Sequence, residues 1–557
     1  MRDAGLKVQD VSDYTGSREI LDGRVKTLHP IVHGGLLAVR GNPSHEQQME
    51  ENGIRPIDMV VMNLYAFDAT VASGANFDTC IENIDIGGPS MLRSSAKNHA
   101  YVTIATSPLQ YTSIMEEMKA NNGCTLLATR KKLASAAFTM SATYDASISR
   151  YFAAQLNDTA PVEVRTYKPQ MSLKYGCNPH QKPAGVFSVL GDRLPFQILN
   201  GTPGYINFLD AMNAWQLVTE LKKSLGIPAA ASFKHCSPAG AALGVPLTPA
   251  EILAYEMPNA TTLTPAALAY VRARNADPMC SFGDFAALSD VVDVVTAKVM
   301  KVEVCDGIIA PGYEAEALEI LKSKKKGSFI ILQADLDFTP PNTEFREVYG
   351  ACFSQKRNDT LITSDMMDNI VTGSSLSQEA KNDLILASIA VKYTQSNSVG
   401  YAKNGQMIGV GAGQQSRVDC VKLAGRKLQI WYLRQHPKVQ GLKFKSTVGR
   451  QARVNARVRY IEGDITMSER PVWEANFEEV PTPLTDEEKS AFLKTLSGVS
   501  ISSDAFFPFR DNIDHASKYG VKFVAQPGGS VADEDIKSAC AEYGMTMAFT
   551  NLRLFHH

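Results

Sequence analysis

The chain of 557 residues is too long for one hydrophobic core, and its length predicts three or four structural units. An apolar fraction of 44% and a charged fraction of 20% are typical of globular proteins, and a formal net charge of −2 argues against nucleic acid or an anionic membrane as a partner. The N-terminal residues lack the apolar core of a signal peptide, and no apolar run approaches transmembrane length. The expected location is therefore cytoplasmic, in the cytosol.

The nine cysteines are scattered along the chain, and none forms a CxxC pair. This spacing argues against a disulfide framework and against a zinc site, and it is typical of reduced thiols. Cys236 could be a nucleophile, but cysteine is also common as a small buried residue. The motifs of P-loop enzymes, serine hydrolases and zinc deaminases are absent from the sequence.

Residues 1–156 are predicted to form an α/β domain. Two apolar runs, at 59–67 and 99–107, are typical of buried strands, and the helical stretches between them favour parallel pairing. Residues 129–156 place apolar side chains at steps of three and four, which predicts an amphipathic helix that closes the domain. The polar stretch 157–171 is predicted to be a linker.

The first candidate site is DGRVKTLHP, at residues 22–30, with His-Gly-Gly following at 33–35. Arg24, Lys26 and Thr27 bring two cations and a hydroxyl into one turn-like stretch. Together with the glycines, these groups suit a phosphate monoester. A solvated basic loop is the alternative interpretation.

A second candidate is IDIGGPSMLRSSAKNHA, at residues 84–100. It places Asp85 at an expected strand end, followed by a Gly-Gly turn and, further along, by Lys97. A carboxylate and a lysine on the ends of separate elements could share a general acid/base site. A surface ion pair is the alternative.

Residues 172–557 again have a mixed pattern. Because a single core has a size ceiling, this length predicts two α/β lobes. The runs typical of strands lie at 305–311, 328–333 and 521–526, and helical stretches lie at 315–326 and 533–544.

The segment FKHCSPAG, at residues 233–240, follows a run of small apolar residues that is typical of a buried strand. Lys234 and His235 are poor residues for a packed interior, because their charged forms lose hydration there. Ser237 followed by Pro238 predicts a helix start. The pair is therefore expected on a strand-to-helix turn, where open α/β sheets place their ligand sites. A solvated basic loop is the alternative.

Two later segments are also candidates. MIGVGAGQQSR, at residues 407–417, predicts a short strand and a glycine-rich turn, after which Arg417 could clamp a phosphate or carboxylate; a plain tight turn is the alternative. SSDAFFPFRDN, at residues 502–512, would suit a flat heteroaromatic ligand or would form an apolar plug. The C-terminal TNLRLFHH is expected to be tucked into the fold.

Several short segments occur in the chain in this order: GRVKTLHP, NLYAF, DIGGPSMLRSSAKNHA, KYGCNPHQ, SFKHCSPAG, SFGDFAALSD, CDGIIAPGY, TQSNSV, GAGQQSR, ISSDAFFPFRD and NLRLFHH. In this order they resemble the bifunctional AICAR transformylase/IMP cyclohydrolase family of purine biosynthesis, in its eukaryotic-like form. The resemblance covers essentially the whole chain.

The resemblance implies a methylglyoxal-synthase-like N-terminal domain and a C-terminal transformylase of two cytidine-deaminase-like lobes. The transformylase would transfer a formyl group from the cosubstrate 10-formyltetrahydrofolate to AICAR ribonucleotide, and the first domain would cyclise the product to IMP. No zinc is expected, whereas a monovalent cation is possible. The family is homodimeric, with transformylase sites at the subunit interface, and its partners are small-molecule substrates.

For formyl transfer, the resemblance implies that His235 is the general base, that Lys234 stabilises the developing oxyanion and that Asn397 holds the reacting groups. The positions that match AICAR-nucleotide contacts are Lys174, Tyr175, His235, Gly283, Asp306, Asn397, Arg417, Phe506 and Arg553. The positions that match folate contacts are Val418, Asp511, Ser530 and Val531.

For ring closure, the resemblance implies that Lys97 transfers the proton, with Lys26 assisting. Asp85 and Tyr65 match further catalytic positions. The positions that match IMP contacts are Arg24, Val25, Lys26, Thr27, Met62, Asn63, Asp85 and Ile86.

The sequence departs from the family pattern in three places. The family has a strand–helix–strand unit with two phosphate-binding glycine turns ahead of the segment that begins here at Met1. It also has proline where this chain has Ala66, and arginine where this chain has Lys174. Lysine keeps the charge but loses the bidentate fork. The alternative function is therefore a transformylase whose cyclohydrolase half is impaired by the missing phosphate loops.

Overall fold

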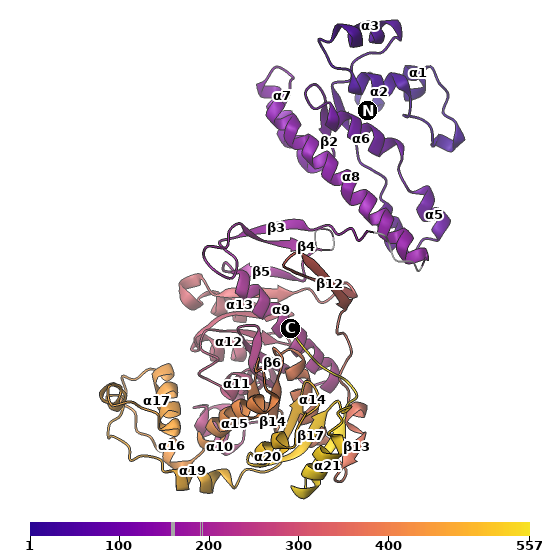
Figure 1. The fold of residues 1–557 in the computed structure, drawn as a ribbon. Helices are drawn as coiled ribbons and strands as arrows, with labels where there is room; N and C mark the ends of the chain where they lie inside the picture. Colours follow the sequence, from indigo (N-terminus) through magenta and orange to yellow (C-terminus); the bar gives the residue numbers. More distant parts are fainter. Residues whose placement is uncertain (157–161, 190, 192) are drawn as a thin grey trace. The chain divides into compact units, whose positions relative to one another are not determined.

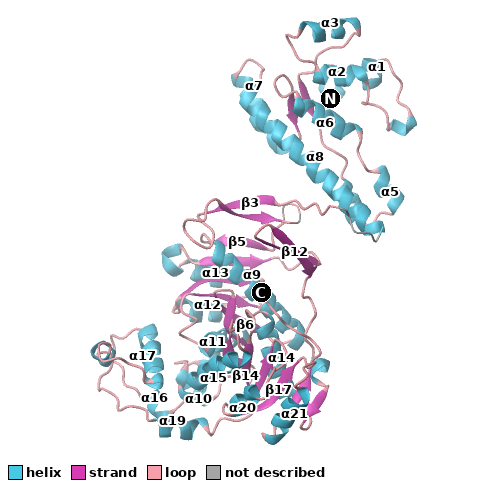
Figure 2. Ribbon diagram, viewed as in Figure 1, coloured by secondary structure: helices cyan, strands magenta, loops and turns pink. Residues whose placement is uncertain are grey.

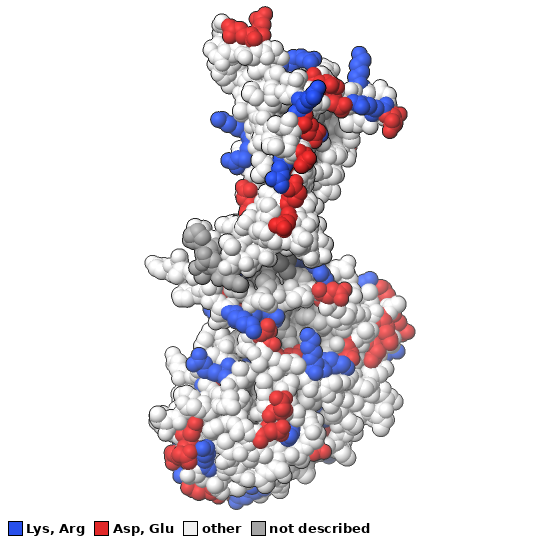
Figure 3. All heavy atoms as spheres, turned by 90° about the vertical axis from the view of Figure 1, so that its right-hand side faces the viewer, with Lys and Arg blue, Asp and Glu red and all other residues white. Residues whose placement is uncertain are grey.

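The protein is represented by a computed structural model that describes residues 1–156, 162–189, 191 and 193–557. The chain forms two compact units, Met1–Lys168 and Pro169–His557. Residues 157–161 of the expected linker lie outside the described residues. On the face shown in Figure 3, acidic and basic side chains lie interspersed, as expected from a net charge of −2.

The first unit is built on a small parallel sheet. Its strands pair in the register Met59↔Thr103 to Val61↔Ala105, which confirms the predicted parallel pairing. The strands are β1 (Met59–Val61) and β2 (Thr103–Ala105); the helices are α1 (Val11–Thr15), α2 (Pro30–Leu37), α3 (Pro43–Glu51), α4 (Phe67–Ala72), α5 (Phe77–Glu82), α6 (Gly87–Lys97), α7 (Tyr111–Ala120) and α8 (Leu127–Leu156).

The closing helix of the first unit is confirmed as α8, the long helix of this unit in Figure 1. It packs on α6 and β2. Leu92, Ala96, Ile104 and Ala137 are fully buried between these elements, so the apolar stripe predicted from the spacing faces the core.

The second unit is built on a twelve-stranded sheet in the order β13-β18-β17-β16-β14-β15-β7-β6-β8-β9-β10-β5 (Figure 2). Its strands are β5 (Phe196–Asn200), β6 (Ala229–Lys234), β7 (Ser237–Leu243), β8 (Asp284–Leu288), β9 (Cys305–Ala310), β10 (Ile330–Ala334), β13 (Ile370–Thr372), β14 (Val399–Lys403), β15 (Gln406–Gly411), β16 (Val499–Ser503), β17 (Val521–Gln526) and β18 (Thr546–Phe549). Two further pairs are β3 (Lys168–Leu173) with β4 (Ala184–Ser188), and β11 (Thr343–Val348) with β12 (Ala351–Lys356).

The helices of the second unit are α9 (Tyr205–Leu225), α10 (Pro249–Ala254), α11 (Pro265–Ala276), α12 (Val294–Lys301), α13 (Ala315–Lys322), α14 (Gln378–Lys392), α15 (Arg417–Leu433), α16 (Pro437–Gln440), α17 (Arg450–Glu462), α18 (Arg470–Glu474), α19 (Asp486–Leu493), α20 (Asp511–Ser517) and α21 (Asp533–Glu542). The strands and helices predicted at 305–311, 328–333, 521–526, 315–326 and 533–544 are confirmed, each within a few residues.

The large sheet contains one arrangement twice. A helix (α9 or α14) leads into a hairpin (β6–β7 or β14–β15), which a second helix (α11 or α15) follows. The next strand pairs antiparallel with the first hairpin strand, and two more strands continue in parallel. The two halves meet where β7 and β15 pair antiparallel at Gln406↔Ala242.

Two local predictions are wrong. Ser237 and Pro238 open strand β7 and not a helix, because this segment pairs with β6 along its whole length. The glycines at 33–35 lie inside α2, where Gly34 and Gly35 allow close packing on Ile54 and the backbone of Arg55, so they do not form a phosphate loop.

The other corrections concern element boundaries. Asp85 precedes helix α6 and does not end a strand, and the Gly-Gly pair opens that helix. Strand β3 begins at Lys168, inside the stretch expected to be linker up to residue 171. Among the described residues, no helix is long and apolar enough to cross a membrane.

Candidate active sites

The Lys-His pair lies on the tight turn of the β6–β7 hairpin. Lys234 pairs with Ser237, which leaves His235 and Cys236 as a two-residue loop. Both loop residues have positive φ angles, 52° and 58°. Hairpins of this length need positive φ at both positions and favour Asn-Gly there, because other side chains crowd the backbone. The tip is nevertheless formed by two residues that disfavour this conformation, which indicates a functional role.

The ammonium group of Lys234 is fixed by backbone carbonyls. Its Nζ donates to the carbonyl oxygens of Gly283 at 2.8 Å and of Phe282 at 3.1 Å. Gly283 has a φ of 71°, and a Cβ at this position would lie 3.2 Å from Lys234 Nζ. Glycine therefore provides both the backbone conformation and the space for the lysine.

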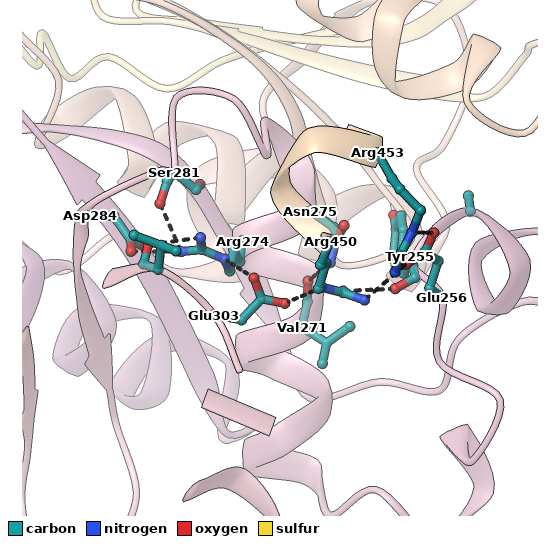
Figure 4. A network of polar contacts seen from close by, with 12 residues as sticks. Tyr255, Glu256, Val271, Arg274, Asn275, Ser281, Asp284, Glu303, Arg450 and Arg453 are labelled. Carbon is teal, nitrogen blue, oxygen red and sulfur yellow. Dashed lines mark hydrogen bonds and ion pairs between the residues drawn. The ribbon is translucent and has the colours of Figure 1, made fainter. Parts of the chain in front are cut away.

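The segment that carries these carbonyls is anchored by a buried ion-pair network (Figure 4). Arg274 donates to the carbonyl oxygen of Ser281 at 2.7 Å and to Asp284 at 2.7 Å, on either side of Gly283. Arg274 also pairs with Glu303 at 3.0 Å. Arg274 and Asp284 are almost fully buried, so the network is held in a medium where charge pairs are strong.

The thiol of Cys236 does not fit the role of nucleophile. Burial and, to a smaller extent, the neighbouring Asp210 carboxylate together raise the pKa of this thiol to about 11. The thiolate is the reactive form of cysteine, so this residue is protonated and inert at neutral pH. The interpretation of Cys236 as a small, partly buried residue is the one that the structure supports.

A second cluster is formed by Asn397, Arg417 and Asp504. Asn397 Nδ2 donates to the carbonyl oxygen of Gln414 at 3.0 Å, and its Oδ1 accepts from Arg417 Nη2 at 2.9 Å. Arg417 is buried and pairs with Asp504, which is fully buried. Arg417 therefore organises this loop from inside, and the carboxylate that it holds in the structure is that of Asp504.

Asp504 is a site residue that the sequence analysis missed. Its carboxylate accepts from Ser396 Oγ at 2.7 Å and from Ser398 N at 2.9 Å, so it holds both ends of the Asn397 loop. The C-terminal segment closes the same cluster, because Leu554 N donates to the carbonyl oxygen of Asp504 at 2.7 Å. The expectation of a tucked C-terminus is confirmed.

The two clusters lie next to each other. Gln395 N donates to Ser237 Oγ at 3.3 Å, which links the Asn397 loop to the residue that follows the His235 turn. The structure thus brings together Lys234, His235, Gly283, Asn397 and Arg417 at one end of the central strands.

The remaining predicted AICAR-contact residues are spread over other elements. Asp306, at the start of β9, pairs with Lys325 at 2.6 Å. Phe506 is 39% exposed, and the guanidinium of Arg553 lies over the ring of Phe555. Lys174 and Tyr175 follow β3, on the separate β3–β4 pair.

The predicted folate-contact residues lie in the first turns of α15 and α20 and in the loop after β17. Val418 is in the first turn of α15 and Asp511 is the first residue of α20. Ser530 and Val531 follow β17, where the side chain of Val531 is fully exposed. No hydrogen bond or ion pair among the described residues joins the side chains at these positions to Lys234 or His235, so their role rests on the resemblance.

In the first unit, the loop that carries Arg24, Lys26 and Thr27 meets the N-terminus of α6. Arg24 pairs with Glu82 just ahead of this helix, and Thr27 Oγ1 lies 2.6 Å from the position that a Cβ on Gly87 would occupy. Lys26 pairs with Glu19 at 3.0 Å. Backbone N–H groups at a helix N-terminus favour an anion, so this end of α6 is suited to bind one.

The other predicted cyclohydrolase residues fall at both ends of α6. Asp85 Oδ1 accepts from Gly88 N at 2.7 Å at the start of the helix. Lys97 is the last residue of α6 and is exposed. At a rise of 1.5 Å per residue, it lies about 15 Å along the helix axis from the first residue. The structure therefore does not bring Asp85 and Lys97 together. The other positions are Val25, bridged to Ile20; Met62, Asn63 and the exposed Tyr65, after β1; and the exposed Ile86.

No group of three or more His, Cys, Asp or Glu side chains among residues 1–156, 162–189, 191 and 193–557 could hold a metal ion.

Comparison with known proteins gives a consistent result for both units. The family described as "AICARFT/IMPCHase bienzyme" matches residues 95–427, and the "MGS-like domain" family matches residues 1–90. A "Bifunctional purine biosynthesis protein PurH" from Roseobacter denitrificans is 36% identical over 564 residues, covering 100% of this chain and 92% of that protein. A protein of the same name from Magnetococcus marinus is 37% identical over 570 residues, with the same coverage.

A solved structure titled "Crystal structure of ForH" is 36% identical to this chain. The match covers 27% of this chain and 79% of the chain in that structure. Its TM-score of 0.24 is too low to support an argument about the fold.

Proposed function

The chain belongs to the AICARFT/IMPCHase bienzyme family, and we propose that Lys234 and His235 carry out its formyl transfer. The protein is a bifunctional enzyme of purine biosynthesis. It transfers a formyl group from 10-formyltetrahydrofolate to AICAR ribonucleotide, and it cyclises the product to IMP. The comparisons do not favour the alternative of an enzyme with the first activity alone.

Formyl transfer needs a base and an oxyanion stabiliser. The amino group of AICAR is a feeble nucleophile, because it is conjugated with the ring and its carboxamide. Its nitrogen bonds to the formyl carbon while the imidazole of His235 takes the proton that leaves the nitrogen. The formyl oxygen becomes an oxyanion beside the ammonium of Lys234. The bond from the formyl carbon to folate N10 then breaks, and N10 receives the proton from His235.

The single observation that carries this proposal is the conformation of the β6–β7 turn. His235 is exposed at the tip at a positive φ, and Lys234 is held beside it by two carbonyls. Asn397 lies on the adjacent loop, which is linked to the turn through Ser237. We propose that Asn397 holds the reacting groups and that Arg417 fixes Asn397.

The proposal is tested by His235→Ala. Removal of a general base should lower kcat of formyl transfer by about 10²- to 10⁴-fold and leave AICAR affinity, measured by calorimetry, nearly unchanged. Lys234→Ala should also lower kcat. Lys403→Ala is its matched control, because Lys403 precedes the corresponding turn of the β14–β15 hairpin. Near-normal turnover in His235→Ala would refute the assignment.

For ring closure, we propose that the nucleotide binds at the N-terminus of α6, where Arg24, Thr27 and Asp85 contact it. The carboxamide nitrogen attacks the formyl carbon, and water leaves after proton transfers. Lys97 and Lys26 are the proposed proton-transfer groups. Because they lie on different elements, separate substitutions can distinguish their contributions.

We also propose that the enzyme is a homodimer. The β11–β12 hairpin exposes Tyr349 completely and Phe353 to 62%, which supports a partner subunit that covers it. Sedimentation at assay concentration should show a dimer, and a fully active monomer would contradict this.

Two further proposals concern the conditions in which the enzyme works. All nine cysteines are free, which supports a reducing compartment such as the cytosol. A requirement for a monovalent cation is tested by formyl-transfer assays in potassium and in tetramethylammonium salts at equal ionic strength.

A further inference from the structure

Each of the two equivalent hairpins of the large sheet has a buried aspartate behind it. Asp210 is the sixth residue of α9, and Asp383 is the sixth residue of α14. Their side chains are 6% and 5% exposed. The mechanism above gives Asp210 no role, although it lies beside the catalytic turn.

Both carboxylates accept hydrogen bonds from the backbone of the turn in front of them. Cys236 N donates to Asp210 Oδ1 at 2.7 Å. In the other half, Asn404 N and Gly405 N donate to Asp383 at 2.9 and 2.6 Å. Hydrogen bonds to a charged acceptor are stronger than neutral ones, so both turns are firmly held.

A pair of glycines confirms that the two hairpins correspond residue by residue. Gly240 and Gly409 are each the fourth residue of the second hairpin strand. A Cβ on either would lie 2.2 Å from a helix carbonyl oxygen, that of Ala273 or of Ala424. Counting back from these glycines, Cys236 corresponds to Gly405.

The two turns differ in how easily they form. Asn404 and Gly405 are the residues that a two-residue hairpin turn favours, whereas His235 and Cys236 each occupy the left-handed region, where their side chains crowd the backbone. The Asn404–Gly405 turn is also remote from the reaction. Gly405 O accepts a hydrogen bond from Leu243 N, and Leu243 is the last residue of β7. At 3.3 Å per residue, Leu243 lies about 20 Å from Ser237, the first residue of this strand.

We propose that Asp210 is a positioning residue for formyl transfer, which holds the left-handed His235–Cys236 turn by accepting the Cys236 N–H. This inference rests on the proposed function of His235. Without the carboxylate, the partly buried N–H loses its acceptor and the turn relaxes toward conformations that its side chains prefer. His235 then moves away from its working position, and a displacement of about 1 Å is enough to slow a reaction severely.

Burial raises the pKa of Asp210, and the Cys236 N–H together with the charges of His235 and Lys234 acts against that effect. The charges of both proposed catalytic groups therefore act on the carboxylate that holds their backbone.

The test compares variants of Asp210 at equal folded fraction, measured by near-UV circular dichroism. Asp210→Ala should lower kcat of formyl transfer by about 10- to 100-fold, the range that a hydrogen bond to a charged group accounts for, with KM for AICAR changed less than about threefold. Asp210→Asn keeps an acceptor and the side-chain volume, so it should fold and should lose less. Wild-type kcat in both Asp210→Ala and Asp210→Asn would overturn the proposal.

A second substitution tests the mechanism of positioning. Glycine adopts positive φ without cost, so Cys236→Gly should make the carboxylate less necessary. In the Cys236→Gly background, Asp210→Ala should lower kcat by about twofold or less. An equal loss in both backgrounds would show that Asp210 does not act through the conformation of this turn.

Asp383→Ala is the matched control. It removes the same contact from the hairpin turn that lies away from the reaction, so it should lower the melting temperature but leave kcat per folded enzyme unchanged. Equal loss of kcat in the Asp210 and Asp383 variants would overturn the proposal. His235→Ala separates the two levels of the argument: if it is active, the proposed function fails, and if it is inactive while Asp210→Ala is fully active, only the positioning role fails.

Discussion

Lys234 Nζ lies 2.8 Å from the carbonyl oxygen of Gly283 and 3.2 Å from the place where a side chain at residue 283 would begin. Glycine at position 283 therefore leaves room for Lys234, the proposed oxyanion stabiliser, and adopts the positive φ without strain. This relationship joins two strands, because Lys234 ends β6 and Gly283 precedes β8.

Gly283→Ala should lower kcat of formyl transfer by about tenfold, because the new methyl group displaces the ammonium and strains a backbone at a φ of 71°. Gly226→Ala is the matched control. Gly226 has the same φ of 71° at the end of α9, and nothing lies within 4 Å of its Cβ position. Both variants should lose similar stability in thermal melts, and only Gly283→Ala should lose turnover. Turnover that falls equally in both would contradict the account.

Arg274→Met should destabilise the second unit strongly. It leaves Asp284 buried without its ion-pair partner, a change that typically costs about 3–5 kcal/mol, and it leaves Glu303 paired with Arg450 alone. Kinetics should show an additional loss of kcat, because the segment that holds Lys234 is released. The control is Arg193→Met, which breaks a solvent-exposed pair with Asp335 and should cost less than about 1 kcal/mol. Similar melting temperatures for the two variants would show that the Arg274 network is not structural.

Glu256 should make stability depend on pH. Burial raises its pKa, but hydrogen bonds and charges from Arg453 and Arg457 outweigh burial and lower the pKa from 4.5 to about 2. Since the folded pKa is below the unfolded one, the stabilisation is complete above about pH 4.5 and is lost as pH falls toward 2. Glu256→Gln should therefore lower the melting temperature at pH 7, and the difference from the wild type should shrink below pH 4.5. A difference that is constant down to pH 3.5 would contradict this.

Lys97→Ala and Lys26→Ala test the proposed proton transfer in ring closure. Supplied with formylated AICAR, Lys97→Ala should form IMP about 10²- to 10⁴-fold more slowly, and Lys26→Ala should show a smaller loss. Lys119→Ala, an exposed lysine in the last turn of α7, is the control. If Lys97→Ala cyclises at the control rate while Lys26→Ala does not, the proton-transfer role belongs to Lys26.

Much of the site could be predicted from the sequence, because its chemistry stands next to strong patterns. Lys234 and His235 follow an unbroken small apolar run, so a polar pair at a strand end was evident. The helix expected after Ser237 was wrong because the local preference of Ser-Pro competes with pairing on β6, which wins. A two-residue turn made of His and Cys contradicts the usual turn chemistry, so it could not be expected from local residues.

The supporting carboxylates could not be found in this way. Asp210 and Asp504 are single acidic residues far along the chain from the groups they hold, and an isolated aspartate is usually a solvated surface residue. Their burial comes from tertiary packing alone. For Asp504 the sequence contained a weak signal, since this residue lies in the segment 502–512, which was already a candidate ligand site.

The measurement that tests the central claim most directly is the rate of both half-reactions in His235→Ala. We expect that the variant fails to formylate AICAR within the range given above, and that it converts supplied formylated AICAR to IMP at the wild-type rate, because ring closure is assigned to the first unit. Normal formyl transfer, or loss of both activities in a folded variant, would contradict the account.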